Sequence, residues 1–185
     1  MTDDDRPVFY YDLASPYAWL AAERIHDVMP VTPVWQPILL DAHDGGSAEV
    51  ERRAREYGLM EVRWPEQWPF DSLLAMRAAT FAQQAGRAVA FSLAAFRQAF
   101  CAGRDLSELD SVLIAAAACE LHPKAVTKGV ESKSVKDRLR AATDEAAARG
   151  VTGVPTVAVG DELFWGDDQL EKAATAAAAR YDTAS

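Results

Sequence analysis

The beginning of the chain alternates between β-type and helical patterns of apolar residues. Residues 8–11 form a short apolar run typical of a buried strand, and residues 16–28 follow with apolar positions at helical spacing. The run at residues 31–40 is rich in β-forming residues, but Pro33 and Pro37 lack the N–H group that a central strand donates. We therefore expect an edge strand there, or a short strand running into a loop. Strand, helix and strand in this order predict two parallel strands joined by a crossover.

The middle of the chain is mainly helical in its apolar pattern. Residues 41–46 are rich in Asp and Gly and predict a turn. Asp41, His43 and Asp44 have metal-ligating side chains, but no second ligand group follows at a suitable spacing, so we interpret them as a solvated loop. Helices are expected at residues 48–57, 72–84, 88–102, 107–121, from 123 onward, and at 134–149.

Residues typical of helix N-termini support two of these helix starts. Asp71 precedes the helix at residues 72–84, and its carboxylate is a favoured N-cap. Ser107 is followed three residues later by Asp110, a spacing that resembles a capping box. We therefore expect both side chains to bind backbone N–H groups at the helix start.

The end of the chain returns to a β pattern. Residues 150–160 predict a loop and then a strand, residues 161–165 predict the second strand of a hairpin, and a helix is expected at 169–180. The order βαβ, helical insertion, ββα is that of an α/β thioredoxin-like fold with a large all-helical insertion. We divide the chain accordingly into a thioredoxin-like domain, residues 1–40 and 150–185, and a mainly helical insertion, residues 41–149.

Charge and composition exclude several classes of function. The 185 residues carry a net charge of −9 with no basic face to neutralise phosphates, which argues against nucleic acid as a partner. The acidic start lacks the cationic and apolar parts of a signal peptide, and no run is apolar enough to span a membrane. We therefore expect a cytoplasmic protein without a membrane partner. Cys101 and Cys119 are too far apart for a redox CxxC motif, and we expect both to be buried, reduced and inert.

Ser15 and Pro16 stand where the first strand gives way to the first helix. Serine is a favoured N-cap, and proline is favoured at the next position because its missing N–H would have had no partner there. A helix N-terminus stabilises a nearby anion by about 0.3–1 kcal/mol when exposed and up to about 2 kcal/mol when partly buried. Two interpretations stay open from this pattern: Ser15 is a helix cap only, or it also holds an anion.

Residues 63–70 form an aromatic segment interrupted by prolines. Trp64, Trp68 and Phe70 lie between prolines that prevent a regular helix or central strand. Such a segment either packs on the surface of the domain or forms the wall of a pocket for an apolar ligand.

Two motifs at opposite ends of the chain carry a family resemblance. They are DLASPYAWLA near the start and GVPTVAVGDELFWGDDQLE near the end. The second resembles the loop of thioredoxin-like proteins in which the proline, here Pro155, is cis. The positions of the redox CxxC read Ser15-Pro16-Tyr17-Ala18, so dithiol–disulfide exchange is excluded. Together the motifs resemble the 2-hydroxychromene-2-carboxylate isomerases and kappa-class glutathione transferases, which are DsbA-like proteins.

This resemblance implies a set of site residues. Ser15 matches the serine that hydrogen-bonds the glutathione sulfur, and the backbone of Val154, beside Pro155, matches the part that pairs with the cysteinyl residue. Asp167 and Asp168 match the pair that holds the γ-glutamyl end. By position, residues of the substrate wall are expected at Tyr11, Tyr17, Trp64, Trp68 and Asp71. Members of the family often have an asparagine near Asp71, and this sequence contains none.

The implied activity is that of a glutathione-dependent isomerase or transferase. A bound glutathione, or another low-molecular-weight thiol, would add as a thiolate to a small, conjugated, aromatic electrophile. The resemblance also implies a homodimer and no metal cofactor. An alternative function is a non-catalytic thioredoxin-fold module that binds a small thiol or a peptide in the groove beside Pro155.

Overall fold

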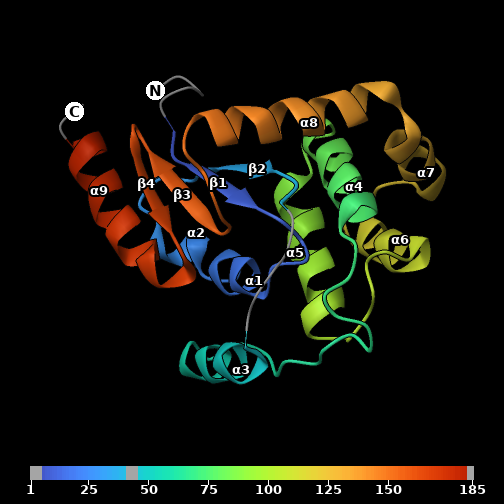
Figure 1. Ribbon diagram of the computed structural model, residues 1–185, viewed down its shortest axis with the longest axis horizontal. Helices are drawn as coiled ribbons and strands as arrows, with labels where there is room; N and C mark the ends of the chain where they lie inside the picture. The colour runs from blue at the N-terminus through green and yellow to red at the C-terminus, as the bar shows by residue number, and fades with distance from the viewer. Residues whose placement is uncertain (1–5, 41–45, 183–185) are drawn as a thin grey trace.

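The computed structural model describes residues 6–40 and 46–182, and its centre is a four-stranded mixed sheet (Figure 1). The strand order is β2-β1-β3-β4, with β1 and β2 parallel and the other neighbours antiparallel. This topology confirms the parallel pair, the C-terminal hairpin and the edge position of the proline-containing strand. The strands are β1 (Val8–Tyr11), β2 (Val34–Pro37), β3 (Thr156–Val159) and β4 (Glu162–Trp165).

Helices cover both faces of the sheet, and the helical insertion lies beside its β2 edge. Figure 1 shows α1 and α9 on one side of the sheet, α8 across the other, and α3 at one end of the molecule. The predicted α/β thioredoxin-like class with a large helical insertion is confirmed. The helices are α1 (Pro16–Ala22), α2 (Ile25–Val28), α3 (Ser47–Glu56), α4 (Leu73–Gln84), α5 (Ala88–Phe100), α6 (Leu109–Ala118), α7 (Pro123–Glu131), α8 (Lys133–Ala148), the 3-10 turn η2 (Asp167–Gln169) and α9 (Leu170–Asp182).

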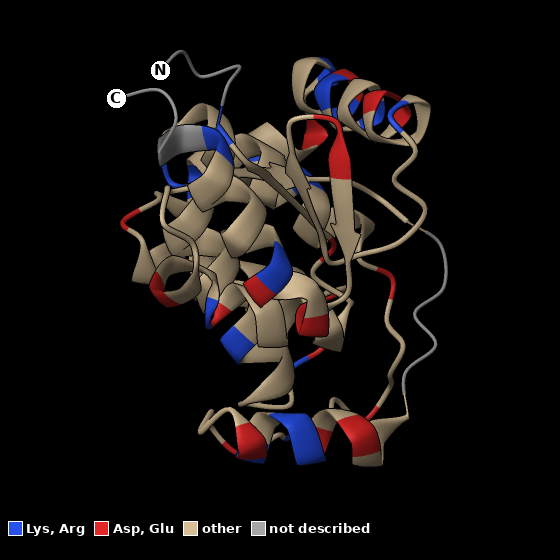
Figure 2. Cartoon of the chain, turned by 90° about the vertical axis from the view of Figure 1, so that its left-hand side faces the viewer, with Lys and Arg blue, Asp and Glu red and all other residues tan. Residues whose placement is uncertain are grey.

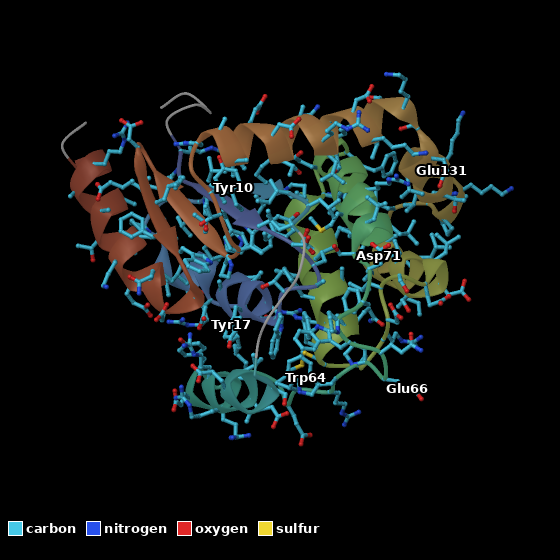
Figure 3. All side chains as sticks on the ribbon, in the orientation of Figure 1. Tyr10, Tyr17, Trp64, Glu66, Asp71 and Glu131 are labelled. Atoms are coloured by element: carbon cyan, nitrogen blue, oxygen red, sulfur yellow. The ribbon has the colours of Figure 1, made fainter. Side chains whose placement is uncertain are left out.

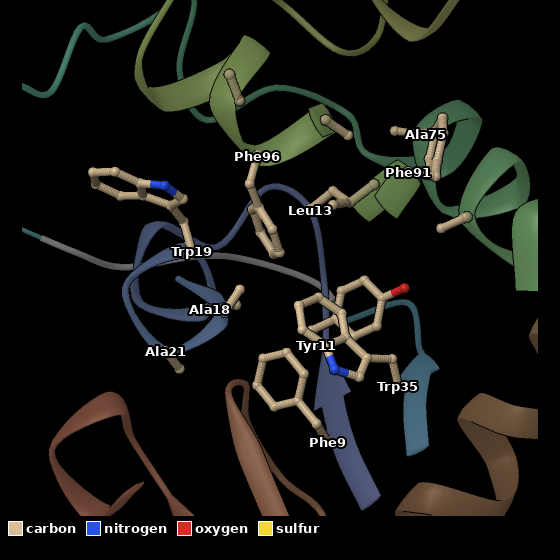
Figure 4. Close-up of a cluster of buried hydrophobic side chains, with 14 of the residues drawn as sticks. Phe9, Tyr11, Leu13, Ala18, Trp19, Ala21, Trp35, Ala75, Phe91 and Phe96 are labelled. Carbon is tan, nitrogen blue, oxygen red and sulfur yellow. The ribbon is translucent and has the colours of Figure 1, made fainter. Parts of the chain in front are cut away.

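Aromatic side chains of the sheet fill the main core (Figure 4). Phe9 stacks on Tyr11 with ring centroids 5.5 Å apart, and Trp35 meets both rings edge-on. Residues of the helical part, including Phe91 and Phe96, belong to the same buried cluster. Full burial of such a side chain contributes about 1.5–3 kcal/mol, so this cluster dominates the stability of the sheet and of the helices packed on it. The predicted division into two domains stays a prediction.

The segment expected as one helix at residues 16–28 is interrupted. Its two parts, α1 and α2, meet at a turn in which the N–H of Arg24 donates to the carbonyl oxygen of Ala21 at 3.1 Å. The side chains at this turn make tertiary contacts: Glu23 pairs with Arg97 of α5, and Arg24 pairs with Glu171 of α9. These contacts with neighbouring helices cannot be read from the local periodicity.

The prediction of a capping box formed by Ser107 and Asp110 is wrong. The helix α6 begins at Leu109, and its N-cap residue Glu108 makes no side-chain cap hydrogen bond. The N–H of Ser107 donates instead to the Asp105 carboxylate at 2.8 Å, so an Asp-based turn replaces the box.

Two other helix starts differ only slightly from the prediction. The N-cap residue of α4 is Ser72 and not Asp71 as expected, but the Asp71 carboxylate does accept from the N–H of Leu73, the first helical residue, at 2.8 Å. Helix α8 begins one residue before Ser134, because Ser132 is its N-cap and accepts from the N–H of Val135 at 3.3 Å.

The cysteines confirm one expectation and correct another. Cys119 is buried, but Cys101 is only partly buried. Burial raises the pKa of both thiols, that of Cys101 to about 11, so both are held as neutral thiols near pH 7. The expected turn containing Asp41, His43 and Asp44 lies outside the described residues. Within those residues, no helix is long and apolar enough to cross a membrane.

Candidate functional site

Three chain segments meet at one edge of the sheet. The antiparallel register pairs Tyr10 of β1 with Thr156 of β3, so the residues just before β3 lie level with the residues that follow β1. Thr156 also pairs with Trp165, the last residue of β4. The loop into α1, the loop into β3 and the turn into α9 therefore come together, although they are far apart in the sequence.

Ser15 is the N-cap of α1 and is almost completely buried, with 2% of its surface exposed. Its side-chain oxygen accepts from the N–H of Ala18 at 3.1 Å, and Pro16 occupies the first helical position. The predicted cap is therefore confirmed. Within the described residues the hydroxyl proton of Ser15 has no acceptor, so it is available for donation to an anion at the helix N-terminus.

Asp12 fixes the loop that carries Ser15. Its buried carboxylate accepts from the N–H of Ala14 at 2.9 Å, the N–H of Leu40 at 3.2 Å and the hydroxyl of Ser72 at 3.1 Å. Its carbonyl oxygen accepts from the N–H of Ser15 at 3.0 Å. These contacts join the end of β1 to the segment after β2 and to the start of α4. The position of the Ser15 hydroxyl therefore depends on how these three segments pack together.

The loop before β3 has the expected cis peptide bond between Val154 and Pro155. The carbonyl oxygen of Pro155 accepts from the N–H of Gly166 at 2.9 Å, so this loop is tied to the turn that precedes α9. In the part of the chain that the structure describes, the N–H and C=O of Val154 make no hydrogen bond. Such a free backbone edge can pair with an extended ligand. The Trp68–Pro69 bond is also cis, which the sequence did not indicate.

Asp167 is buried, with 1% of its surface exposed, at the start of the turn into α9. Its carboxylate is held from α3: Arg53 pairs with Oδ1 at 2.6 Å, and the Tyr57 hydroxyl donates to Oδ2 at 3.0 Å. Burial raises the pKa of Asp167, and these two donors act against that rise. The neighbouring Asp168 is exposed. The two carboxylates therefore have different environments, which their adjacency in the sequence did not predict.

Two arginines, Arg53 of α3 and Arg24 before α2, pack on aromatic rings beside the site. The Arg53 guanidinium lies 5.4 Å from the ring centroid of Tyr17, and the Arg24 guanidinium lies 3.8 Å from that of Tyr57. Burial and the nearby Asp167 charge raise the pKa of Tyr57 to about 12, which keeps its hydroxyl a donor at neutral pH. Figure 3 shows Tyr17 between α1 and α3.

The aromatic segment at residues 63–70 reaches the same region. The indole N–H of Trp68 donates to the carbonyl oxygen of Ala14 at 3.3 Å, directly beside Ser15. Trp64 lies on Trp68, with ring centroids 4.8 Å apart, and donates to Glu51 of α3 at 2.9 Å. Both rings are partly buried against the core and partly open, so this segment packs on the domain and also borders the loop that carries Ser15.

Two of the expected wall residues lie elsewhere. Tyr11 has no exposed surface; it is part of the aromatic core and hydrogen-bonds Ser92 at 2.7 Å, because its position in β1 directs it into the layer beneath the sheet. Asp71 is exposed and its carboxylate binds the start of α4, beside which Figure 3 shows it. The assignment of Tyr11 to the substrate wall is therefore corrected, because the residue belongs to the core. The Asp71 carboxylate binds the first N–H group of α4.

Comparison with known proteins identifies the family. The sequence model of the DSBA-like thioredoxin domain matches residues 8–178. The chain belongs to this family. A DSBA-like relative, 2-hydroxychromene-2-carboxylate isomerase of Sphingobium xenophagum, is 26% identical over 181 residues, covering 88% of this chain and 93% of the relative.

Solved structures of DSBA-like proteins have the same fold. A structure of 2-hydroxychromene-2-carboxylate isomerase matches with a TM-score of 0.81 at 21% identity, covering 97% of this chain and 99% of that one. The cytosolic disulfide reductase DsbM of Pseudomonas aeruginosa, solved with GSH, matches with a TM-score of 0.69 at 15% identity, covering 96% and 98%. At these identities the structural likeness shows the shared fold.

Several site residues were missed at the level of sequence. No role was predicted for Asp12, which follows the first strand, or for Arg53 and Tyr57, which lie in the helix expected at residues 48–57. An aspartate three residues before a helix cap is a sequence signal for Asp12, because its side chain can bind the N–H groups of the loop between them. For Arg53 and Tyr57 no local signal exists, since their partner Asp167 is more than a hundred residues away.

Proposed function

We propose that this DSBA-like protein is a glutathione-dependent isomerase or transferase that acts on a small, conjugated, aromatic electrophile. The observation that carries the proposal is the Ser15 hydroxyl, held at the N-terminus of α1 with its proton available to an anion. Support comes from the relative that is named as a 2-hydroxychromene-2-carboxylate isomerase and from the structural neighbour that was solved with GSH.

The residues of the site fit a bound thiol at two points. Ser15 would donate its proton to the sulfur, and the positive end of α1 would favour the thiolate over the thiol. The free N–H and C=O of Val154, beside the cis Pro155, would pair with the cysteinyl backbone of the tripeptide. Together the two contacts would fix the position of the sulfur, and the contact with Ser15 at the start of α1 would lower the pKa of the thiol.

The chemistry that glutathione supplies when bound is a thiolate that adds to the conjugated carbon of the substrate and is later expelled, with isomerisation by rotation between the two steps. Ser15 lowers the free energy of the charged sulfur before addition and after expulsion. Tyr17, Trp64 and Trp68 border the loop of Ser15 and would hold the aromatic ring of the substrate against it.

The acidic pair at the start of α9 would bind the γ-glutamyl end. Asp168 is exposed and can accept an ammonium group directly. Asp167 is already bound by Arg53 and Tyr57, so a ligand reaches its carboxylate only by replacing one of them. The homodimer and the cytoplasmic location expected from the sequence remain predictions.

A second candidate function is a non-catalytic module for a small thiol or an extended peptide. The free backbone edge of Val154 favours it, because strand addition needs no catalytic side chain. This function predicts that ligand binding is unchanged in Ser15→Ala and that no electrophile is turned over.

Calorimetry with glutathione and an assay with 2-hydroxychromene-2-carboxylate test the proposal. We expect binding in the wild type, turnover only when glutathione is present, and a loss of about 10²-fold in turnover for Ser15→Ala, the usual cost of removing one donor to a developing charge. Ser15→Thr, which keeps the hydroxyl and the cap, is the control and should retain most activity. No binding of glutathione at millimolar concentration would contradict the proposal.

A further inference from the structure

Helix α3 is attached to the body of the protein by a small, mostly polar contact. Of its ten residues only Val50 and Ala54 are buried, and six are charged, with both signs present (Figure 2). Figures 1 and 2 both show α3 at one end of the molecule, beside α1 and apart from the sheet. Little apolar surface therefore holds it in place, and its polar contacts decide its position.

The strongest of these contacts end on one buried carboxylate. Arg53 and Tyr57, one turn apart on the same helix face, bind the two oxygens of Asp167 at 2.6 and 3.0 Å. Glu49 of α3 holds the Arg53 guanidinium from the other side at 2.7 Å. The contact thus joins α3 to the turn that precedes α9, directly beside the loop of Ser15.

The other charged groups near this contact are themselves engaged, with one exception. Arg24 pairs with Glu171 and donates to the carbonyl oxygen of Asp167 at 3.4 Å, while its guanidinium lies on the ring of Tyr57. Asp168 is exposed and has no hydrogen bond or ion pair within the described ranges. A cation that approaches from solvent is therefore attracted first to Asp168 and then meets Asp167.

A buried carboxylate that loses its cation is strongly destabilised, because its charge is then neither solvated nor paired. Arg53 can leave Asp167 at low cost only if another cation takes its place. A primary ammonium is the group that fits, since it is compact and donates three hydrogen bonds. The γ-glutamyl end of glutathione carries such a group.

We propose that Arg53 closes α3 over the site in the absence of ligand, and that a thiol with a distal primary ammonium opens it by replacing Arg53 on Asp167. This inference rests on the proposed function of the same site. It makes Arg53 a specificity-determining residue, because thiols without the ammonium cannot displace it. Because the thiol binds only the open molecules, its apparent affinity equals the affinity of the open state multiplied by the fraction of molecules that are open.

Arg52 provides a matched control on the same helix. Among the described residues it pairs with Glu49 and Glu56 of α3 alone, and it is half exposed, so its removal leaves the contact with Asp167 in place. Arg53→Gln and Arg52→Gln change charge and length equally, and each removes a contact with Glu49. Of the two, only Arg53→Gln removes the ion pair with Asp167, together with the contact on the Tyr17 ring.

Titration calorimetry with two probes tests the inference. The probes are glutathione and the same tripeptide with its amino group acetylated. We expect glutathione to bind Arg53→Gln about tenfold more tightly than the wild type, and Arg52→Gln within about twofold of it, since only the first change removes the competing cation. The acetylated probe should gain nothing from Arg53→Gln. Weaker binding of glutathione to Arg53→Gln, or an equal gain for both probes, would overturn the inference.

Hydrogen exchange of the α3 amides in ligand-free protein gives a second, independent reading. Exchange should be faster in Arg53→Gln and in the milder variant Tyr57→Phe than in the wild type, and unchanged in Arg52→Gln. Equal exchange in all four proteins would overturn this inference alone, even where glutathione binds. Absence of glutathione binding in every protein would overturn the proposed function, and this inference with it.

Discussion

At the scale of single residues, two groups define the site. One is the Ser15 hydroxyl, whose proton has no acceptor among the described residues, and the other is the buried Asp167 carboxylate, which is bound by two side chains. Ser15 accepts one hydrogen bond and keeps its proton available, whereas Asp167 is buried and depends on Arg53 and Tyr57. Asp12 holds the loop that carries Ser15, because its carboxylate accepts from the backbone N–H groups of Ala14 and Leu40.

The pH dependence of stability reports on Asp167. Burial raises its pKa, and a carboxyl group whose pKa is raised by folding stabilises the folded state fully below its unfolded pKa of about 3.9. That contribution is lost as pH rises through the raised pKa. The free energy of unfolding of the wild type, relative to Asp167→Asn, should therefore fall as pH rises from about 3 to 7.

Denaturant titrations of both proteins at several pH values measure this difference. A difference that grows with pH would contradict the account, because it would mean that Arg53 and Tyr57 outweigh the cost of burial and lower the pKa of Asp167.

The residues that sequence reasoning found and those it missed differ in one physical respect. Ser15 follows from a cap signal within four residues, and Pro155 follows from a local motif. Arg53, Tyr57 and the burial of Tyr11 depend on which surfaces meet in three dimensions, and a charged helix face looks the same in sequence whether it meets solvent or a buried carboxylate.

At the scale of secondary structure, the periodicity of apolar residues predicted that the helices are present but did not predict where they begin and end. The four strands and the long helices appear near the predicted positions, since apolar spacing reflects the face that is buried. The ends differ where a side chain has two competing partners. Ser132 caps α8 although Ser134 stands two residues later, and the box expected at Ser107 is replaced by a turn around Asp105.

The start of α8 gives a test at this scale. Ser132→Ala removes the side chain that accepts from the N–H of Val135, and it should lower the free energy of unfolding by about 1 kcal/mol. Ser134→Ala is the matched control: Ser134 is exposed inside the helix, and its replacement should change stability by less than about 0.5 kcal/mol. Equal effects in urea titrations would show that the cap is misassigned.

At the scale of the whole molecule, the helical insertion and the sheet share one core. The main buried cluster contains residues of β1 and α1 together with residues of α4, α5, α6 and α7. The order of elements indicated this architecture from the sequence, because strands at both ends must meet in one sheet. The sequence did not indicate that α3 is tied to the turn before α9 by the contact of Arg53 with Asp167.

A shared core predicts cooperative unfolding. Far-ultraviolet circular dichroism follows mainly the helices, and tryptophan fluorescence reports on all five tryptophans, of which Trp19 and Trp35 lie in the core. The two signals should give one superimposable thermal transition. Two separated transitions would show instead that the insertion unfolds independently of the thioredoxin-like part.

The central claim is that Ser15 stabilises a thiolate at the start of α1. Its most direct test is a pH titration of the ultraviolet absorbance of the thiolate of glutathione bound to the wild type and to Ser15→Ala. The account predicts a bound-thiol pKa below the value of about 8.5 for a free cysteine thiol, and a rise of about one unit or more in Ser15→Ala. Titration curves that coincide for the two proteins would contradict it.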